Sequence, residues 1–241
     1  MTRWCSPLDE SVFEALKNYD SPTLSNAIEL FDVRARDEGY LSHQVRCMFP
    51  DLGVMVGYAA TATMRARGKP TGDSRSAWAH VREVPAPRVM VVQDLDEPPG
   101  HGALWGEVQA STFTALGCVG AVTDGCVRDL AEAHAIGFQF YAQSVGVSHG
   151  YARIESVGEP VTVGGQTVAP GDLIHADQHG VLLIPTEIAA ELPAAADRLI
   201  AAEQEFIRWV RSGDFDPDLL AERRSTLQEA MHTKLAPSKI P

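Results

Sequence analysis

Between residues 88 and 142 the chain alternates apolar runs with amphipathic segments, and this alternation limits its fold more than any other feature. A continuous β-branched run at 88–94 predicts a buried strand, and further strands are predicted at 119–123 and 138–142. Helices are predicted between them at 103–116 and 130–136, each followed by a glycine suited to end it. Strand–helix–strand units of this kind favour right-handed crossovers and a largely parallel sheet.

The segments on either side of this core predict an α/β fold with a β-rich hairpin section and a long C-terminal helix. One domain is expected over residues 1–212, and the tail at 213–241 is expected to pack on a neighbouring subunit. The other predicted elements are helices at 8–18, 74–84 and 186–211, a short helix capped by Ser21 or Thr23, a strand at 54–64, and hairpins at 159–168 and 173–184.

Bulk composition excludes several classes of partner. Hydrophobic residues make up 45% of the 241 residues, enough for a substantial core. The formal net charge of −12 argues against nucleic acid or an anionic membrane as partner, because both need a basic surface. The four cysteines form no C-x-x-C pair, and no run of about 18 apolar residues occurs. A reducing, cytoplasmic setting is the simplest expectation.

The candidate chemistry lies where a strand of small residues ends in an Arg128-Asp129 pair, with twenty residues between Glu107 and Arg128. Two carboxylates suit Mg²⁺ or Mn²⁺, and a guanidinium offers a planar fork of donors to a substrate carboxylate or an enolate oxygen. Glu107 follows Gly106 in the first turn of a predicted helix, where free backbone amides favour an anion. The spacing alone also fits a capping aspartate beside a surface salt bridge.

Nearby residues extend this candidate site. The amides of Val108 and Gln109 are expected to hold the carboxylate of a 2-oxo acid, and His101 lies on the loop before them. Trp105 fits either a packing role or the wall of the pocket. Arg65, Arg67 and Lys69 form a basic loop that could close over an anionic substrate or simply be solvated.

The segment from Gly102 to Asp129 contains Gly-Glu followed later by Gly-Ala-Val-Thr-Asp-Gly-Cys-Val-Arg-Asp. This segment resembles the signature of the RraA-like family. Pro170-Gly-Asp-Leu-Ile-His-Ala-Asp177 is similar to a second family signature, and the segment beginning at Asp20-Ser-Pro-Thr resembles a third. The family includes 4-hydroxy-4-methyl-2-oxoglutarate / 4-carboxy-4-hydroxy-2-oxoadipate aldolases and the regulator of ribonuclease activity A. The resemblance covers roughly residues 15–210.

This resemblance implies an αββα sandwich related to the swivelling phosphohistidine domain, assembled as a homotrimer or homohexamer. It implies that Asp129 holds the metal, that Arg128 binds pyruvate and stabilises its enolate, and that the Val108 and Gln109 amides hold the carboxylate. The chain departs from the aldolase pattern at Glu107, where the family has Asp. Glu107 is one methylene longer, and it could ligate the metal directly or reach a metal-bound water.

The resulting hypothesis is a class II-type pyruvate aldolase, a carbon–carbon lyase acting on a small anionic 2-oxo acid. Oxaloacetate decarboxylation would proceed through the same enolate. Two alternatives stay open from the sequence: a non-catalytic protein-binding regulator of the ribonuclease-inhibitor type, and a different metal-dependent reaction on a sugar acid or hydroxy acid.

Overall fold

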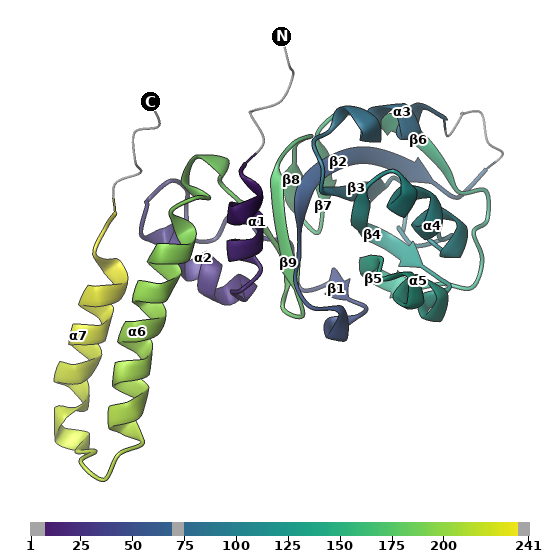
Figure 1. The fold of residues 1–241 in the computed structure, drawn as a ribbon. Helices are drawn as coiled ribbons and strands as arrows, with labels where there is room; N and C mark the ends of the chain where they lie inside the picture. Colours follow the sequence, from purple (N-terminus) through teal and green to yellow (C-terminus); the bar gives the residue numbers. More distant parts are fainter. Residues whose placement is uncertain (1–7, 69–74, 236–241) are drawn as a thin grey trace.

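The computed structural model describes residues 8–68 and 75–235 of the chain, which form a mixed α/β fold (Figure 1). The expected positions Lys69 and Ser74 lie outside the described residues. The elements are α1 (Glu10–Leu16), α2 (Ser21–Glu29), β1 (Arg46–Cys47), η1 (Pro50–Leu52), β2 (Met55–Arg65), α3 (Arg75–Glu83), β3 (Arg88–Asp94), α4 (Glu107–Ala115), β4 (Cys118–Val127), α5 (Leu130–Ile136), β5 (Gln139–Val145), β6 (Arg153–Val157), β7 (Val161–Val163), β8 (Gln166–Val168), β9 (Leu173–Asp177), β10 (Gly180–Ile184), η2 (Thr186–Ile188), α6 (Leu192–Val210), η3 (Pro217–Leu219) and α7 (Leu220–His232).

The main sheet of the described chain has eight strands in the order β1-β5-β4-β3-β2-β9-β10, with β6 paired to β2. Strands β2, β3, β4 and β5 run parallel, as the alternation predicts, and the outer strands are antiparallel. The long strand β2 pairs with β9 along its first half and with β6 along its second half. The sheet therefore curls into a nearly closed, barrel-like surface.

Apolar side chains fill both sides of this sheet. One cluster lies against the helices and includes Trp105, Phe138 and Phe140. The other lies under the β7–β8 hairpin, where Val163 and Val168 pack on the sheet. The expected second sheet of an αββα sandwich is thus only the two-stranded pair β7–β8. This hairpin, with its turn at Gly164 and Gly165, forms as the sequence predicts.

Two predicted boundaries near the candidate site are wrong. The helix expected from residue 103 begins at Glu107, because the preceding segment is extended: Trp105 forms a parallel β-bridge with Val127. The strand expected to end at residue 123 continues to Val127. A register shift in the β4–β5 pairing between Thr123 and Cys126 carries the strand past Asp124-Gly125, which resembles a turn in the sequence.

Other boundaries shift because local hydrogen bonds determine them. Helix α2 is capped by Asp20, whose side chain accepts from the Thr23 amide at 2.8 Å, instead of by Ser21 or Thr23. The helix expected from residue 186 is a 3-10 turn followed by α6, which begins at Leu192. Strands β1 and β6 were not predicted.

Helices α6 and α7 form a hairpin that projects from the barrel (Figure 1). Leu199 and Leu227 are buried, whereas Phe206 and Trp209 are only half-buried, although the helical pattern of residues 186–211 predicts both on its buried face. The aromatic rings of Phe206 and Phe215 both pack on Trp209, with centroids 5.7 and 5.2 Å away. No helix in the described part of the chain is long and apolar enough to cross a membrane.

Candidate functional site

The C-terminal ends of the parallel strands β2, β3 and β4 meet at one edge of the sheet, where ligands collect in folds of this kind. Arg128 and Asp129 follow β4 directly and precede α5. The sequence predicted this placement. Both side chains are about one-third exposed, so they are open to a ligand from solvent.

Asp129 joins two helices. Its backbone has φ 52°, the left-handed conformation that few residues other than glycine adopt, and it precedes the first residue of α5. Its side chain makes no cap to α5. Instead, Oδ2 accepts the backbone N–H of Glu107 at 3.0 Å, so this carboxylate caps the neighbouring helix α4. Sequence reasoning missed this contact.

Arg128 is anchored through its backbone. Its amide donates to the carbonyl of Trp105 at 2.9 Å, and Trp105 is 1% exposed between Phe113 and Phe138. Trp105 is therefore a packing residue and does not line a pocket. The Arg128 Nε lies 3.8 Å from Asp129 Oδ2, too far for a hydrogen bond, so the guanidinium keeps most of its donors for a ligand.

Gly106 packs closely against the side chains of Arg128 and Asp129. A Cβ atom placed on this glycine would lie 2.5 Å from Asp129 Oδ2 and 3.2 Å from Arg128 Nε. Gly106 is also the N-cap of α4 and has no side chain to cap it. The first helical bond runs from the Ala110 amide to the Gly106 carbonyl at 2.9 Å, which leaves the Val108 and Gln109 amides at the open end of the helix.

The remaining predicted residues lie at the rim of this site. Glu107 and His101 are exposed, and the Glu107 carboxylate makes no recorded contact with Asp129 or Arg128. Within the described ranges, no group of three or more His, Cys, Asp or Glu side chains is placed to hold a metal ion. Asp129 keeps Oδ1 without a recorded hydrogen bond. One or two carboxylates completed by water suit Mg²⁺, so this donor set fits such an ion.

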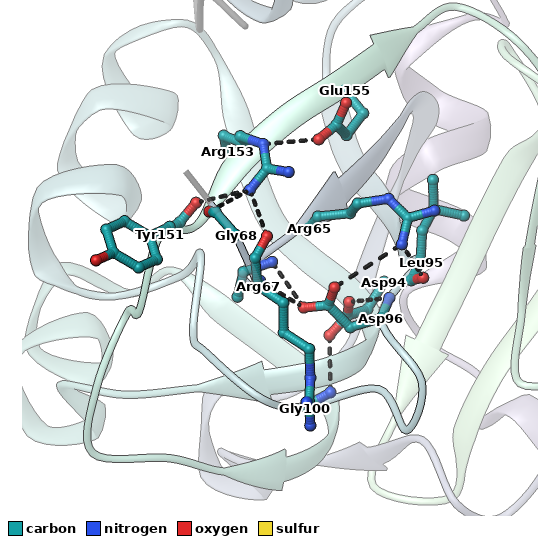
Figure 2. Close-up of polar contacts among 11 residues, drawn as sticks. Arg65, Arg67, Gly68, Asp94, Leu95, Asp96, Gly100, Tyr151, Arg153 and Glu155 are labelled. Atoms are coloured by element: carbon teal, nitrogen blue, oxygen red, sulfur yellow. Dashed lines mark hydrogen bonds and ion pairs between the residues drawn. The ribbon is translucent and has the colours of Figure 1, made fainter. Parts of the chain in front are cut away.

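Beneath the rim, buried carboxylates tie the strand ends together, as Figure 2 shows for Asp94 and Asp96. Asp96 accepts the amides of Ala66 at 2.7 Å and Arg67 at 3.0 Å, and Asp94 accepts the Gly100 amide at 2.7 Å. Sequence analysis did not identify Asp94 and Asp96 as candidate site residues. Acidic residues at the ends of two neighbouring predicted strands were the signal that could have revealed them.

Asp124 belongs to the same group of carboxylates. Its Oδ1 accepts the Asp94 amide at 2.8 Å. Burial raises the pKa of Asp124 to about 6, and the nearby Asp94 charge adds to the rise. Burial also raises the pKa of Asp94. Burial beside the Asp94 carboxylate therefore favours the protonated form of Asp124 in weakly acidic solution.

A cavity of about 410 Å³ lies elsewhere, at the opposite ends of the parallel strands, with Arg34, Tyr58 and Asp172 in its lining. Cavity size would favour it as a binding site. The Arg128–Asp129 region is favoured as the binding site instead. It lies at the strand ends and offers an open carboxylate and free helix amides.

Comparison with protein families gives a match to the RraA-like model, described as Aldolase/RraA, over residues 21–183. The chain belongs to the RraA-like family. The matched span includes β2 to β9 and therefore the whole Arg128–Asp129 region.

Individual relatives of this RraA-like protein are distant. Protein DlpA of Legionella pneumophila is 23% identical over 84% of this chain and 32% of its own length. A putative 4-hydroxy-4-methyl-2-oxoglutarate aldolase of Halalkalibacterium halodurans is 31% identical over 34% of this chain and 40% of its own length. The chain thus spans less than two thirds of the length of the curated relatives it matches.

Solved structures share the fold over most of the RraA-like chain. An uncharacterized protein of Pseudomonas syringae pv. tomato has a TM-score of 0.70 at 24% identity and covers 92% of this chain and 96% of its own. RraAS2 of Streptomyces coelicolor, described as an unusual member of the RNase ES inhibitor RraA protein family, has a TM-score of 0.66 at 25% identity, covering 85% and 98%. The relation to the swivelling phosphohistidine domain remains a prediction.

Proposed function

We propose that this chain is a divalent-metal-dependent lyase that cleaves a carbon–carbon bond in a small 2-oxo acid and releases pyruvate. The observation that carries the proposal is the hydrogen bond from the Glu107 amide to Asp129 Oδ2. It brings a partly exposed carboxylate, an open guanidinium and the free end of α4 into one place. Membership of a family that includes aldolases supports the same activity.

Each of these groups has a part in the reaction. The Val108 and Gln109 amides donate to the carboxylate of the 2-oxo acid, where the helix end favours negative charge. When the C3–C4 bond breaks, its electron pair stays on the pyruvate fragment as an enolate, and the 4-hydroxyl proton leaves to a base. The Arg128 guanidinium donates to the enolate oxygen. Decarboxylation of oxaloacetate would produce the same enolate.

Asp129 would hold the cation through Oδ1, with Glu107 as a second ligand directly or through water. When bound, Mg²⁺ or Mn²⁺ would supply Lewis-acid polarisation of the 2-oxo carbonyl. Asp129 Oδ2 meanwhile keeps the start of α4 in place, so the same carboxylate orients both the cation and the amides that bind substrate.

Metal removal tests this proposal. We expect the purified protein to release pyruvate from 4-hydroxy-2-oxo acids or oxaloacetate with Mg²⁺, and to lose this activity in EDTA. Asp129→Asn should lower turnover at least a hundredfold while leaving Tm nearly unchanged, because an amide oxygen can still accept the Glu107 N–H. Full activity of this variant would contradict the proposal.

Two alternatives predict different results. A non-catalytic regulator is favoured by the likeness to the Streptomyces coelicolor protein and should show neither metal uptake nor turnover. A metal-dependent reaction on a sugar acid or hydroxy acid is favoured by the longer side chain of Glu107. That reading predicts Mg²⁺ uptake, measured by calorimetry, without pyruvate release.

The Arg128 side chain can be tested separately. Arg128→Lys keeps the positive charge but loses the planar fork, so kcat/KM should fall about a hundredfold. Tm should change little, because the Arg128 side chain makes only a loose contact with Asp129. Arg46→Lys, at an exposed position on β1, is the matched control. Wild-type rates in Arg128→Lys would remove the guanidinium from the mechanism.

A further inference from the structure

Three arginines gather where β2 and β6 meet, and two of them are engaged (Figure 2). Arg65 Nη1 donates to the Leu95 carbonyl at 2.6 Å and lies 3.9 Å from Asp96 Oδ1. Arg153 Nε lies 2.7 Å from Glu155 Oε1, and its Nη1 donates to the Arg67 carbonyl at 2.9 Å. Both guanidinium groups therefore have a carboxylate and a backbone carbonyl as partners.

Arg67 differs from these two neighbours. Its backbone is held on both sides, because its amide donates to Asp96 Oδ2 and its carbonyl accepts from Arg153. Its side chain is exposed, and over the described ranges its guanidinium makes no recorded hydrogen bond or ion pair. In Figure 2 the side chain extends away from Arg153 and Glu155. A rigid backbone that presents a free guanidinium is suited to capture an anion.

The position of Arg67 relates it to the candidate site. Arg67 follows the end of β2, and Arg128 follows the end of β4, with only β3 between these two strands. Neighbouring strands lie about 4.8 Å apart, so the two strand ends are separated by about 10 Å. Ala66 also packs closely on Gly102, in the segment that leads to Gly106. Two arginine side chains can approach a single ligand across such a gap.

We infer that Arg67 determines substrate specificity by binding the far carboxylate of a 2-oxo dicarboxylate whose 2-oxo acid end lies at Arg128. This inference rests on the proposed function, and the Arg67 backbone is held in place by the hydrogen bond from its amide to Asp96. A monocarboxylate would leave the Arg67 guanidinium solvated and would lose its contribution. A substrate with two carboxylates therefore binds more tightly.

Binding of two unreactive probes tests the inference without turnover. 2-Oxoglutarate and 2-oxopentanoate have chains of the same length, and a methyl group replaces the far carboxylate in the second. Titration calorimetry in Mg²⁺ should show 2-oxoglutarate binding to the wild type about tenfold more tightly or better. Arg67→Gln should remove this preference and leave the affinity for 2-oxopentanoate unchanged. Arg67→Lys should restore part of it.

Arg224→Gln, which removes an exposed arginine on α7, is the matched control and should keep the wild-type preference. If Arg67→Gln also keeps it, or if the wild type binds the two probes equally, the assignment of Arg67 is wrong while the proposed function stands. If the wild type binds neither probe, the proposed 2-oxo acid site and this inference fail together.

Discussion

At the scale of single residues, the left-handed backbone of Asp129 is the strongest local sign of a functional constraint. An aspartate at φ 52° is uncommon, and such conformations concentrate at sites where the surrounding structure fixes a side chain for a purpose. Here the conformation turns the carboxylate away from its own helix α5 and toward the Glu107 amide. The result couples the Arg-Asp pair to the helix end that would bind substrate.

Asp124 gives a pH-dependent prediction. Its folded-state pKa of about 6 lies above the usual aspartate value, so the folded protein holds this proton more tightly than the unfolded chain. Its stabilising contribution is complete below about pH 4 and is lost as the pH rises through about 6. Asp124→Asn removes this loss and keeps an oxygen acceptor for the Asp94 amide.

The Asp124→Asn variant should therefore be more stable than the wild type above pH 7, by about 1–2 kcal/mol when partial exposure is allowed for. The difference in Tm between the two proteins should grow between pH 4 and 6.5 and then level off, as measured by thermal melts across that range. Asp214→Asn, at an exposed aspartate, is the control. A difference that stays constant with pH would contradict the assignment of the raised pKa to Asp124.

At the scale of elements, local sequence patterns predicted the bounds of helices and strands correctly where those patterns were uninterrupted. The strand at 88–94 and the helix at 130–136 were predicted with the bounds found for β3 and α5, because one is a continuous apolar run and the other ends at Gly137. The Arg-Asp pair was likewise placed at the strand end. Strand β6 was missed, since its pairing with β2 joins residues that are far apart in the sequence.

The errors near the site have tertiary causes. Helix α4 does not extend back to residue 103, because Trp105 pairs with Val127 in a parallel β-bridge and Gly106 is extended. The cap on α4 comes from Asp129, which is 22 positions away from Glu107. No local window contains both partners, so the sequence pattern singled out Glu107 and Asp129 as candidates but did not predict the contact that joins them.

Gly106 allows a test of this joint between elements. Its φ of −160° suits any residue, so Gly106→Ala acts through space alone. The new methyl group would displace the Asp129 carboxylate and Arg128, with a loss of stability of about 1–3 kcal/mol. Activity should fall at least tenfold, since small displacements of catalytic groups are costly. Gly213→Ala, which has open space around it, should change neither activity nor Tm. Unchanged activity in Gly106→Ala would show that the Arg128–Asp129 geometry is not limiting.

At the scale of the whole molecule, the α6–α7 hairpin changes the expectation for the C-terminal region. Helix α7 packs on α6 of its own chain, and Arg198 donates to the Ala230 carbonyl at 3.2 Å between them. Near the tip, the side chains of Val210, Phe215, Leu219 and Leu220 are each about 40% exposed. Apolar groups concentrated at the end of a projecting arm are typical of a surface that contacts another protein.

We expect the tip of this arm to form a subunit interface in the homotrimer or homohexamer that the sequence predicts. Leu219 and Leu220 are more than a third exposed, so charging them should disturb an interface more than the fold. The double variant Leu219→Glu, Leu220→Glu is expected to shift the protein to a smaller assembly with nearly unchanged Tm, as measured by light scattering during size-exclusion chromatography. Arg224→Glu adds negative charge at an exposed polar position of the same helix and should leave the mass unchanged. If all three proteins have the same mass, the tip of the arm does not join subunits.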